Sequence, residues 1–402
     1  MKRLMSVCAA AVCAAVAFAV PKADWLPADV DFTLAGICMQ QEEPVVSAAW
    51  REALTGLDPA LDQMLAEQKD TQKLAAEEPE IYAVVKALTG YSEDGKQMAL
   101  ESIALGMTFP KTAAAFEEFE GLRVVAIFEN PTFKVEAFDQ AVQALLEKKG
   151  TGVNAPTMVK VGEWRLVKPD KLEKPAGIAF CYKPCAQGLV VAVARTLSEV
   201  ELWLAGAKLA ADAPAAAPFA VVKKPADGAY ALKDVAELLN RYVPDEETRK
   251  QVELQAPWLF KTHRVMISGS LEGVNAVAKL AAATDDAEVA GQMKNALEMY
   301  RMMAAQMILP AVFQKPDAAL STWLMKSVTL ETVGAEMQLK AVFEPKALAA
   351  IAKECLELQA KQSQDVEALF GDDAEDFEDD EDDGEEMTLE EATKILDGIE
   401  GK

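Results

Sequence analysis

Histidine is almost absent from this chain, because His263 is the only one among 402 residues. A metal site built from several histidines is therefore excluded, and a Ser-His-Asp or Cys-His triad would have to use His263. This residue is in phase with Val265, Ile267 and Leu271 on a predicted strand, so we interpret it as a partly buried residue on a sheet face. No neighbouring residue in the sequence supplies a nucleophile or an orienting partner. Ser-x-x-Lys, His-Glu-x-x-His and Gly-x-Ser-x-Gly motifs are also absent, so we expect no enzyme activity.

Long apolar runs are missing everywhere except at the N-terminus. There, Lys2 and Arg3 precede an uncharged, Ala-rich run over residues 4–20, and Ala17-Phe18-Ala19 is a small-x-small cleavage site. This pattern predicts a signal peptide over residues 1–19, with cleavage after Ala19. An uncleaved anchor is the alternative. We expect a periplasmic or secreted protein without a transmembrane segment once the signal is removed.

Basic residues are in deficit, with 40 Lys and Arg against 65 Asp and Glu and a net charge of −25. Residues 365–402 hold 18 acidic and 2 basic residues, a net of −16, which leaves −9 for the other 364 residues. A chain with this balance lacks the basic footprint that nucleic-acid binding requires. We therefore expect the partner to be another protein or an apolar ligand, with no nucleic acid.

Cysteines are few, and two of the six lie in the predicted signal peptide. Cys38, Cys181, Cys185 and Cys355 remain, and an oxidising compartment permits disulfides among them. Cys181 and Cys185 flank Tyr-Lys-Pro at a predicted hairpin tip, which makes them a disulfide candidate; two free thiols are the alternative. Two thiolates without further Cys or His do not form a zinc site, and we expect no cofactor. Cys355 is in phase with apolar residues of a predicted helix, which indicates a small buried hydrophobe.

The acidic C-terminus raises the question of a calcium loop. Asp379, Glu381, Asp383 and Glu390 fit positions 1, 3, 5 and 12 of such a loop, and Gly384 fits position 6. However, position 8 is a glutamate instead of an aliphatic residue, and no second loop is present to pair with it. In addition, 12 of the 15 residues from 372 to 386 are acidic, so this spacing is expected by chance. We favour a disordered, solvated tail over residues 365–402.

Two further patterns have both a functional and a structural interpretation. Gly90 to Lys96 has the GxxxxGK spacing of a phosphate-binding loop, but a predicted helix precedes it and Gln97 follows it. A helix C-cap at Gly90 followed by a turn is the favoured interpretation. A predicted helix over about 286–308 carries five methionines, which could form a surface for apolar partners. We favour core filling for these methionines.

The chain predicts an α+β fold, with antiparallel sheets and helices packed on one face. The stretch VGAEMQLKAVF (333–343) alternates apolar and polar residues, as expected for a strand that is solvated on one side. The order β-α-α-β-β-α followed by more strands and a closing helix occurs twice. We therefore predict two similar copies, over residues 20–210 and 211–364, separated at the Ala/Pro-rich segment 211–220.

The start LPADVDFTLAGI and the repeated unit of paired strands followed by an amphipathic helix resemble a group of uncharacterised exported bacterial proteins. The resemblance covers residues 24–360 and implies duplicated α+β domains of unknown function, without implying any catalytic residue. The leading functional hypothesis is a non-enzymatic exported binding or scaffold protein. The alternatives are a periplasmic carrier of an apolar ligand held between sheet and helices and, third, a hydrolase whose site the sequence does not reveal.

Overall fold

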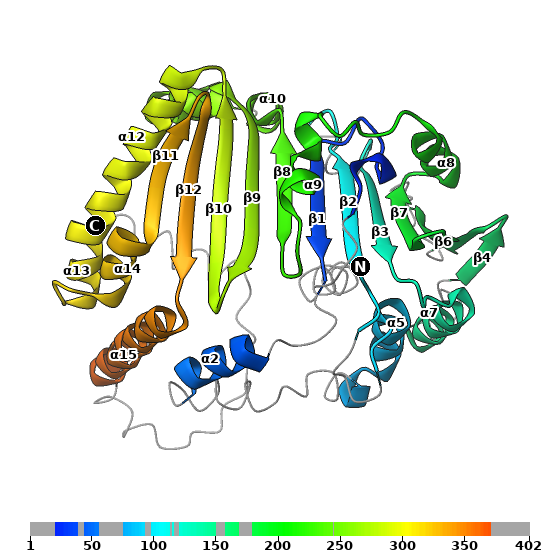
Figure 1. The fold of residues 1–402 in the computed structure, drawn as a ribbon, viewed down its shortest axis with the longest axis horizontal. Coiled ribbons are helices and arrows are strands. Elements are labelled where there is room, and N and C mark those ends of the chain that lie inside the picture. The colour runs from blue at the N-terminus through cyan, green and yellow to red at the C-terminus, as the bar shows by residue number, and fades with distance from the viewer. Residues whose placement is uncertain are drawn as a thin grey trace, which may run out of the picture. The chain divides into compact units, whose positions relative to one another are not determined.

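The computed structural model describes residues 21–38, 44–55, 75–92, 98–112, 115, 120–149, 157–168, 179–243 and 245–370. Its strands form one antiparallel sheet, which Figure 1 shows. The strands are β1 (Phe32–Ile37), β2 (Ser102–Thr108), β3 (Arg123–Glu129), β4 (Thr157–Val161), β5 (Trp164–Lys168), β6 (Ala179–Cys185), β7 (Gly188–Ala194), β8 (Gly228–Lys233), β9 (Thr262–Glu272), β10 (Asn275–Thr284), β11 (Val328–Val333) and β12 (Glu336–Phe343).

Helices occupy the connections between these strands. They are η1 (Ala23–Trp25), α2 (Pro44–Leu54), α5 (Pro79–Thr89), α7 (Val135–Lys149), α8 (Leu197–Ala205), η2 (Pro214–Ala216), α9 (Ala217–Val221), α10 (Val235–Tyr242), α11 (Glu246–Gln255), η3 (Pro257–Lys261), α12 (Ala287–Met303), η4 (Ala304–Ile308), α13 (Leu309–Phe313), α14 (Ala319–Ser327) and α15 (Pro345–Phe370). The expected mixture of helices and antiparallel strands is confirmed. No helix among the residues described combines the length and the apolar character needed to cross a membrane.

The strands of the two predicted segments join a single sheet in the order β11-β12-β10-β9-β8-β1-β2-β3-β7-β6-β5-β4. The connection is the antiparallel pair of β1 and β8, in which Leu34 lies opposite Tyr230. The expectation of a separate sheet in each segment is therefore corrected. Figure 1 shows β8 and β1 side by side in the interior of the sheet.

Helices cover both faces of the sheet in the first segment, and the expectation of helices on one face alone is also corrected. Strand β3 shows this directly, because its side chains alternate between two hydrophobic clusters. Val125 and Ile127 pack with residues of α8, η2 and α9 on one face. Ala126 and Phe128 pack with residues of α5 and α7 on the other face.

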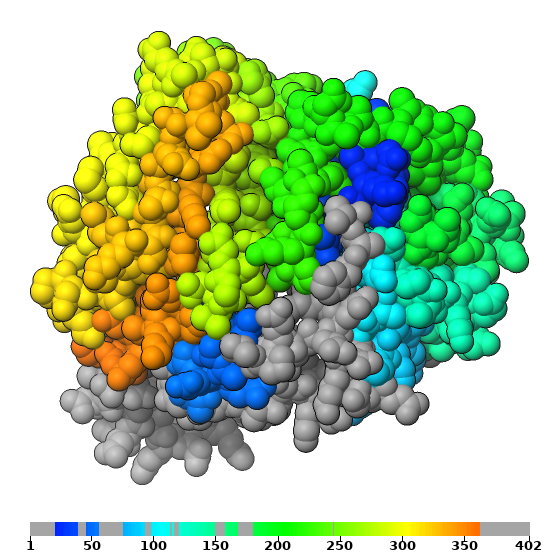
Figure 2. Space-filling view, viewed as in Figure 1, coloured from blue at the N-terminus to red at the C-terminus, as the bar shows by residue number. Residues whose placement is uncertain are grey.

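In the second segment, α12 packs on one face of the sheet, where its buried Met293 joins Ala282 of β10 and Met337 of β12. The opposite face of these strands carries ion pairs, among them Arg264 with Glu336 at 2.9 Å. In the view of Figure 2, the atoms of β10 and β12, coloured yellow-green to orange, are visible at the molecular surface. The polar face predicted for 333–343 is confirmed, although β12 begins only at Glu336, after a turn in which Gly334 has φ +59°.

The Ala/Pro-rich segment 211–220 is not an exposed linker. Ala215, Ala216 and Phe219 are buried in the same cluster as β1 and β8, and the Thr33 hydroxyl donates to the Ala215 carbonyl at 2.5 Å. The predicted boundary between residues 210 and 211 lies inside one compact unit, residues 1–354, while residues 355–402 form a second unit. Helix α15 continues to Phe370, past the predicted start of the acidic tail at residue 365.

Several local predictions are confirmed. Helix α5 ends at Gly90, which is left-handed with φ +65°, and Thr196 caps α8 by accepting from the backbone N–H of Glu199 at 3.1 Å. The hairpin of β9 and β10 turns at Gly273, with φ +66°. The long helix over 286–308 is present but contains the π-helical turn η4, which is followed by Pro310. Pro310 has no N–H for the helical hydrogen bond, and a wider turn before it is a common adjustment.

Candidate functional site

His263 does not lie on a buried sheet face as expected. It is the second residue of β9, and its exposed side chain lies 2.6 Å from a carboxylate oxygen of Asp285, which is also exposed. No Ser, Thr or Cys side chain in the described part of the chain is hydrogen-bonded to it. The pair therefore lacks the nucleophile that a catalytic triad requires.

All four cysteines outside the predicted signal peptide are free thiols, and the candidate disulfide between Cys181 and Cys185 is not formed. Both residues lie in β6, and four residues of an extended strand span about 13 Å, well beyond disulfide reach. Burial raises the pKa of the Cys181 thiol to about 12, so this thiol is not an activated nucleophile. Cys355 is exposed, in contrast to the buried position expected for it.

The weak calcium candidates Asp379, Glu381, Asp383 and Glu390 lie outside the described residues, as do the predicted signal peptide 1–19 and positions 93–97 of the GxxxxGK stretch. Within the described ranges, no group of three His, Cys, Asp or Glu side chains is arranged to hold a metal ion. The Gly90 end of the GxxxxGK stretch is a helix C-cap, as favoured from the sequence.

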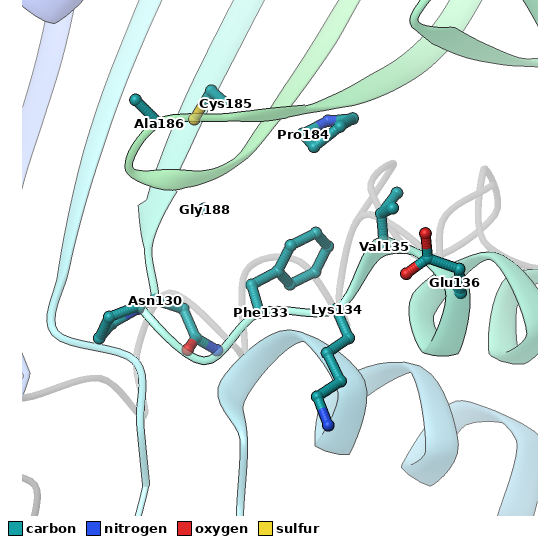
Figure 3. Close-up of a pocket in the computed structure, with 10 residues that line it drawn as sticks. Asn130, Phe133, Lys134, Val135, Glu136, Pro184, Cys185, Ala186 and Gly188 are labelled. Carbon is teal, nitrogen blue, oxygen red and sulfur yellow. The ribbon is translucent and has the colours of Figure 1, made fainter.

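A pocket of about 270 Å³ lies between the segment that follows β3 and the turn from β6 to β7, as Figure 3 shows. Lys134 and Glu136 also line it. The Asn130 side chain donates to the Leu88 carbonyl at 2.8 Å and accepts from the backbone N–H of Thr132 at 2.9 Å. Burial raises the pKa of the half-buried Cys185 thiol, which also lines the pocket. This pocket is smaller than usual ligand sites, and its asparagine is already engaged in shaping the turn.

A second candidate is the apolar face of the sheet between the cluster that contains α5 and α7 and the cluster that contains α12. Leu34 of β1 packs against the cluster of α5 and α7, and Leu280 of β10 packs against the cluster of α12. The strand registers place both in one row across the sheet, with Tyr230 and Ile267 between them. Because residues in register share a face, α5, α7 and α12 cover the two sides of the same face and leave β1, β8 and β9 between them.

We call the partly exposed surface on these three strands the central apolar face. Strands β1 and β8 bury one face and leave the other accessible: Thr33, Ala35 and Ala231 are fully buried, whereas Tyr230 is 40% exposed. The rings of Phe32 and Tyr230 are in contact, with centroids 5.9 Å apart. The residues of the central apolar face are Phe32, Leu34, Gly36, Gly228, Tyr230, Leu232, Ile267 and Gly269.

Three glycines form a row across this face, because Gly36 lies opposite Gly228 and Gly228 lies opposite Gly269. Among the described residues, no atom lies within 4 Å of a Cβ added to any of them, and none has a φ in the left-handed range. Backbone conformation therefore does not require glycine at these positions. Glycine inside strands often marks a place where a ligand or another backbone approaches closely.

The sequence signal for this site lay in glycines inside otherwise apolar predicted strands, and sequence reasoning missed it. No periodicity reveals that three strands so distant in the chain bring their glycines together. The site contains no candidate residue from the sequence, because His263 is not among its residues and the candidate pair Cys181 and Cys185 lies on β6. Its floor has no ionisable carboxylate or amine, so it offers apolar contact in place of acid–base chemistry.

The methionine helix also differs from expectation. Met293 is buried in the core, but Met299, Met302, Met303 and Met307 are exposed. Core filling, the interpretation favoured from the sequence, therefore holds for the first of the five methionines and is wrong for the other four. The exposed four lie on α12 and η4, at the sheet edge beside β11.

Comparisons with known proteins give little. No protein-family model matches the chain, and no curated protein matches it. Among solved structures, crystal forms I and III of TP0453 align with a TM-score of 0.36 and 6% sequence identity, over 83% of this chain and 97% and 98% of theirs. At these values the similarity indicates neither a shared family nor a shared function.

Proposed function

We propose that this protein is a non-enzymatic binding protein that holds an apolar ligand on the central apolar face. The sequence left open a general binding or scaffold protein and a periplasmic carrier of an apolar ligand. The proposal chooses the carrier and keeps the scaffold as the alternative. The row of Gly36, Gly228 and Gly269 carries the proposal, because a Cβ atom added at any of these positions on three interior strands would meet no described atom within 4 Å.

The dimensions suit a flat ring system or a segment of an acyl chain. Residues 32–36 span about 13 Å along β1, and three strands span about 10 Å across. A ligand that removed about 200 Å² of apolar surface from water would gain about 5 kcal/mol, before the entropic cost of association is subtracted. No step of the proposal needs a catalytic group.

The strand order supports the inferred duplication of the chain. From the centre outward, the first segment has the order β1-β2-β3-β7-β6-β5-β4 and the second β8-β9-β10-β12-β11, so the two orders correspond except for β5 and β4 at the outer edge of the first. In each segment, the third of these strands leads into a long helix, α7 or α12. We infer two copies of one unit, joined through β1 and β8, with the central apolar face at their junction.

The compartment is part of the proposal. An exported apolar carrier agrees with the predicted signal peptide, and the acidic segment 365–402 would keep the protein soluble by charge repulsion. Mass spectrometry of the native protein should find Val20 as its first residue. Detection of Met1 at the N-terminus would show that the signal peptide is not cleaved.

The test is the binding of a dansyl-labelled fatty acid, followed by its fluorescence, to the chain from residue 20 to 402. Gly228→Val should weaken binding at least tenfold, because the new side chain fills the open space while the backbone tolerates it. Gly291→Ala is the matched control, since the added methyl also meets no neighbour but lies on α12. Equal binding by wild type and Gly228→Val, or no binding by either, would reject the proposal.

A further inference from the structure

A second apolar surface lies on the outer side of α12, η4 and α13, away from the central apolar face. Its most exposed side chain is that of Met307, at 68%, followed by that of Met299, at 54%. We call it the methionine surface. Its members are Met299, Tyr300, Met302, Met303, Met307, Ile308 and Val312.

The helix that carries this surface packs against the core. Met293 is buried in the cluster with β10 and β12. Arg301 points the other way and donates to the Leu324 carbonyl at 3.2 Å and to the Val328 carbonyl at 2.7 Å. Exposure of the methionines is therefore a property of a well-packed helix and does not arise from a loose end.

Most of the surface comes from an uncharged stretch of the chain. The thirteen residues 302–314 contain no Asp, Glu, Lys or Arg, in a chain where 26% of the residues are charged. Their exposed side chains are apolar or, in Gln306 and Gln314, neutral. The surface exposes roughly 600 Å² of apolar area, which is at the upper end for the largest patch of a monomer.

We propose that the methionine surface binds the same surface of a second copy of this chain, forming a two-fold symmetric dimer. In such a dimer each residue near the axis approaches its own counterpart, so a charged residue there would meet a like charge. The uncharged stretch 302–314 avoids this repulsion. Its apolar area approaches the roughly 800 Å² that each partner contributes to a stable interface.

Helix geometry also suits self-association. Met299, Met303 and Met307 follow each other at intervals of four residues along α12 and η4, so they line one stripe. Long, unbranched methionine side chains interdigitate readily across a helix pair. Residues 365–402 carry a net charge of −16, so repulsion between the two tails opposes association, and salt weakens this repulsion.

Sedimentation equilibrium of the chain from residue 20 to 402 tests the dimer. We expect a monomer–dimer equilibrium that the double substitution Met303→Glu with Met307→Glu weakens at least a hundredfold, because it places four carboxylates in the interface. Leu202→Glu and Leu254→Glu are matched controls. Both replace highly exposed leucines elsewhere, at 73% and 84% exposure, and should leave the equilibrium unchanged.

A second measurement uses the unmodified protein and so does not depend on a variant that folds. Peroxide should oxidise Met299, Met303 and Met307 more slowly in concentrated than in dilute protein, because the dimer shields them. Monomeric protein at every concentration, or dimers that survive the double substitution, would overturn the proposal. Monomers that bind phosphatidylcholine vesicles in a Met307-dependent manner would also overturn it and would assign the surface to lipid.

Discussion

Substitution of Asp139 tests how the first segment is held together. Asp139 lies on α7 and accepts from three groups of the sheet: the Tyr182 hydroxyl at 3.0 Å, and the Nε and second terminal nitrogen of Arg165, both at 2.9 Å. Tyr182 is fully buried, and the Arg165 side chain is only 10% exposed. These hydrogen bonds join α7 to β5 and β6, beside the hydrophobic cluster that α7 forms with the sheet.

The expected cost follows from what each substitution leaves behind. Asp139→Ala strands the nearly buried guanidinium of Arg165 without a counter-charge, which costs about 3–5 kcal/mol. Tyr182→Phe removes one hydrogen bond but leaves the ion pair of Asp139 and Arg165 intact, so it should cost only about 0.5–1.5 kcal/mol.

Urea denaturation followed by circular dichroism measures both costs. Glu246→Gln is the control, because it breaks the exposed pair with Lys250 at 2.8 Å, whose contribution is about 0–1 kcal/mol. A stability loss for Asp139→Ala no larger than that for Glu246→Gln, or a loss for Tyr182→Phe as large as that for Asp139→Ala, would contradict the role given to Asp139.

Three further outcomes are expected. Gly188→Ala should destabilise the fold by about 1–3 kcal/mol in a thermal melt, because φ is +143° and the new Cβ would lie 2.6 Å from the Phe128 carbonyl oxygen; a melting temperature equal to wild type would contradict this. In the native chain from residue 20 to 402, a thiol reagent should label Cys355 quickly and Cys38 and Cys181 slowly. Four thiols should react in denaturant; if only two react, the other two cysteines form a disulfide. The free energy of unfolding should fall between about pH 9 and about pH 12. Cys181 has a pKa of about 12 in the folded chain but about 9.0 when unfolded, so unfolding releases a proton in this range. A urea midpoint that does not change over this range would contradict the prediction.

Local features of the fold were predictable because their causes are local. A glycine after α5, a threonine before α8 and the Glu272-Gly273 turn each act within a few residues, and the structure has all three. Long-range strand pairing was not predictable. Apolar alternation indicates which face of a strand is buried, but it does not specify that β1 pairs with β8, almost 200 residues away.

The error at Cys181 and Cys185 has a related cause. Tyr-Lys-Pro between the cysteines indicated a turn, but β6 continues through Pro184 and the chain turns after Cys185, before Gly188. Strand β5 pairs with β6 only over Phe180–Tyr182, so Pro184 lies beyond the end of β5. Proline is tolerated in strands where a ladder hydrogen bond is not needed.

The central apolar face was invisible in the sequence for the same reason. Each of its glycines is unremarkable alone, and only the registers of β1, β8 and β9 place Gly36, Gly228 and Gly269 in one row. The exposure of the methionines could likewise not be predicted from the sequence, because methionines at helical spacing form the same pattern whether they face a core or solvent.

Photo-crosslinking with a diazirine-bearing palmitate tests the central claim most directly, because it reports where an apolar ligand lies. Mass spectrometry of the labelled chain should locate the adducts in peptides that contain β1, β8 or β9, with Tyr230 the most accessible of their large apolar side chains. Unlabelled palmitate should compete them away. Adducts concentrated on Met299 to Met307, or spread over the chain without competition, would contradict the account.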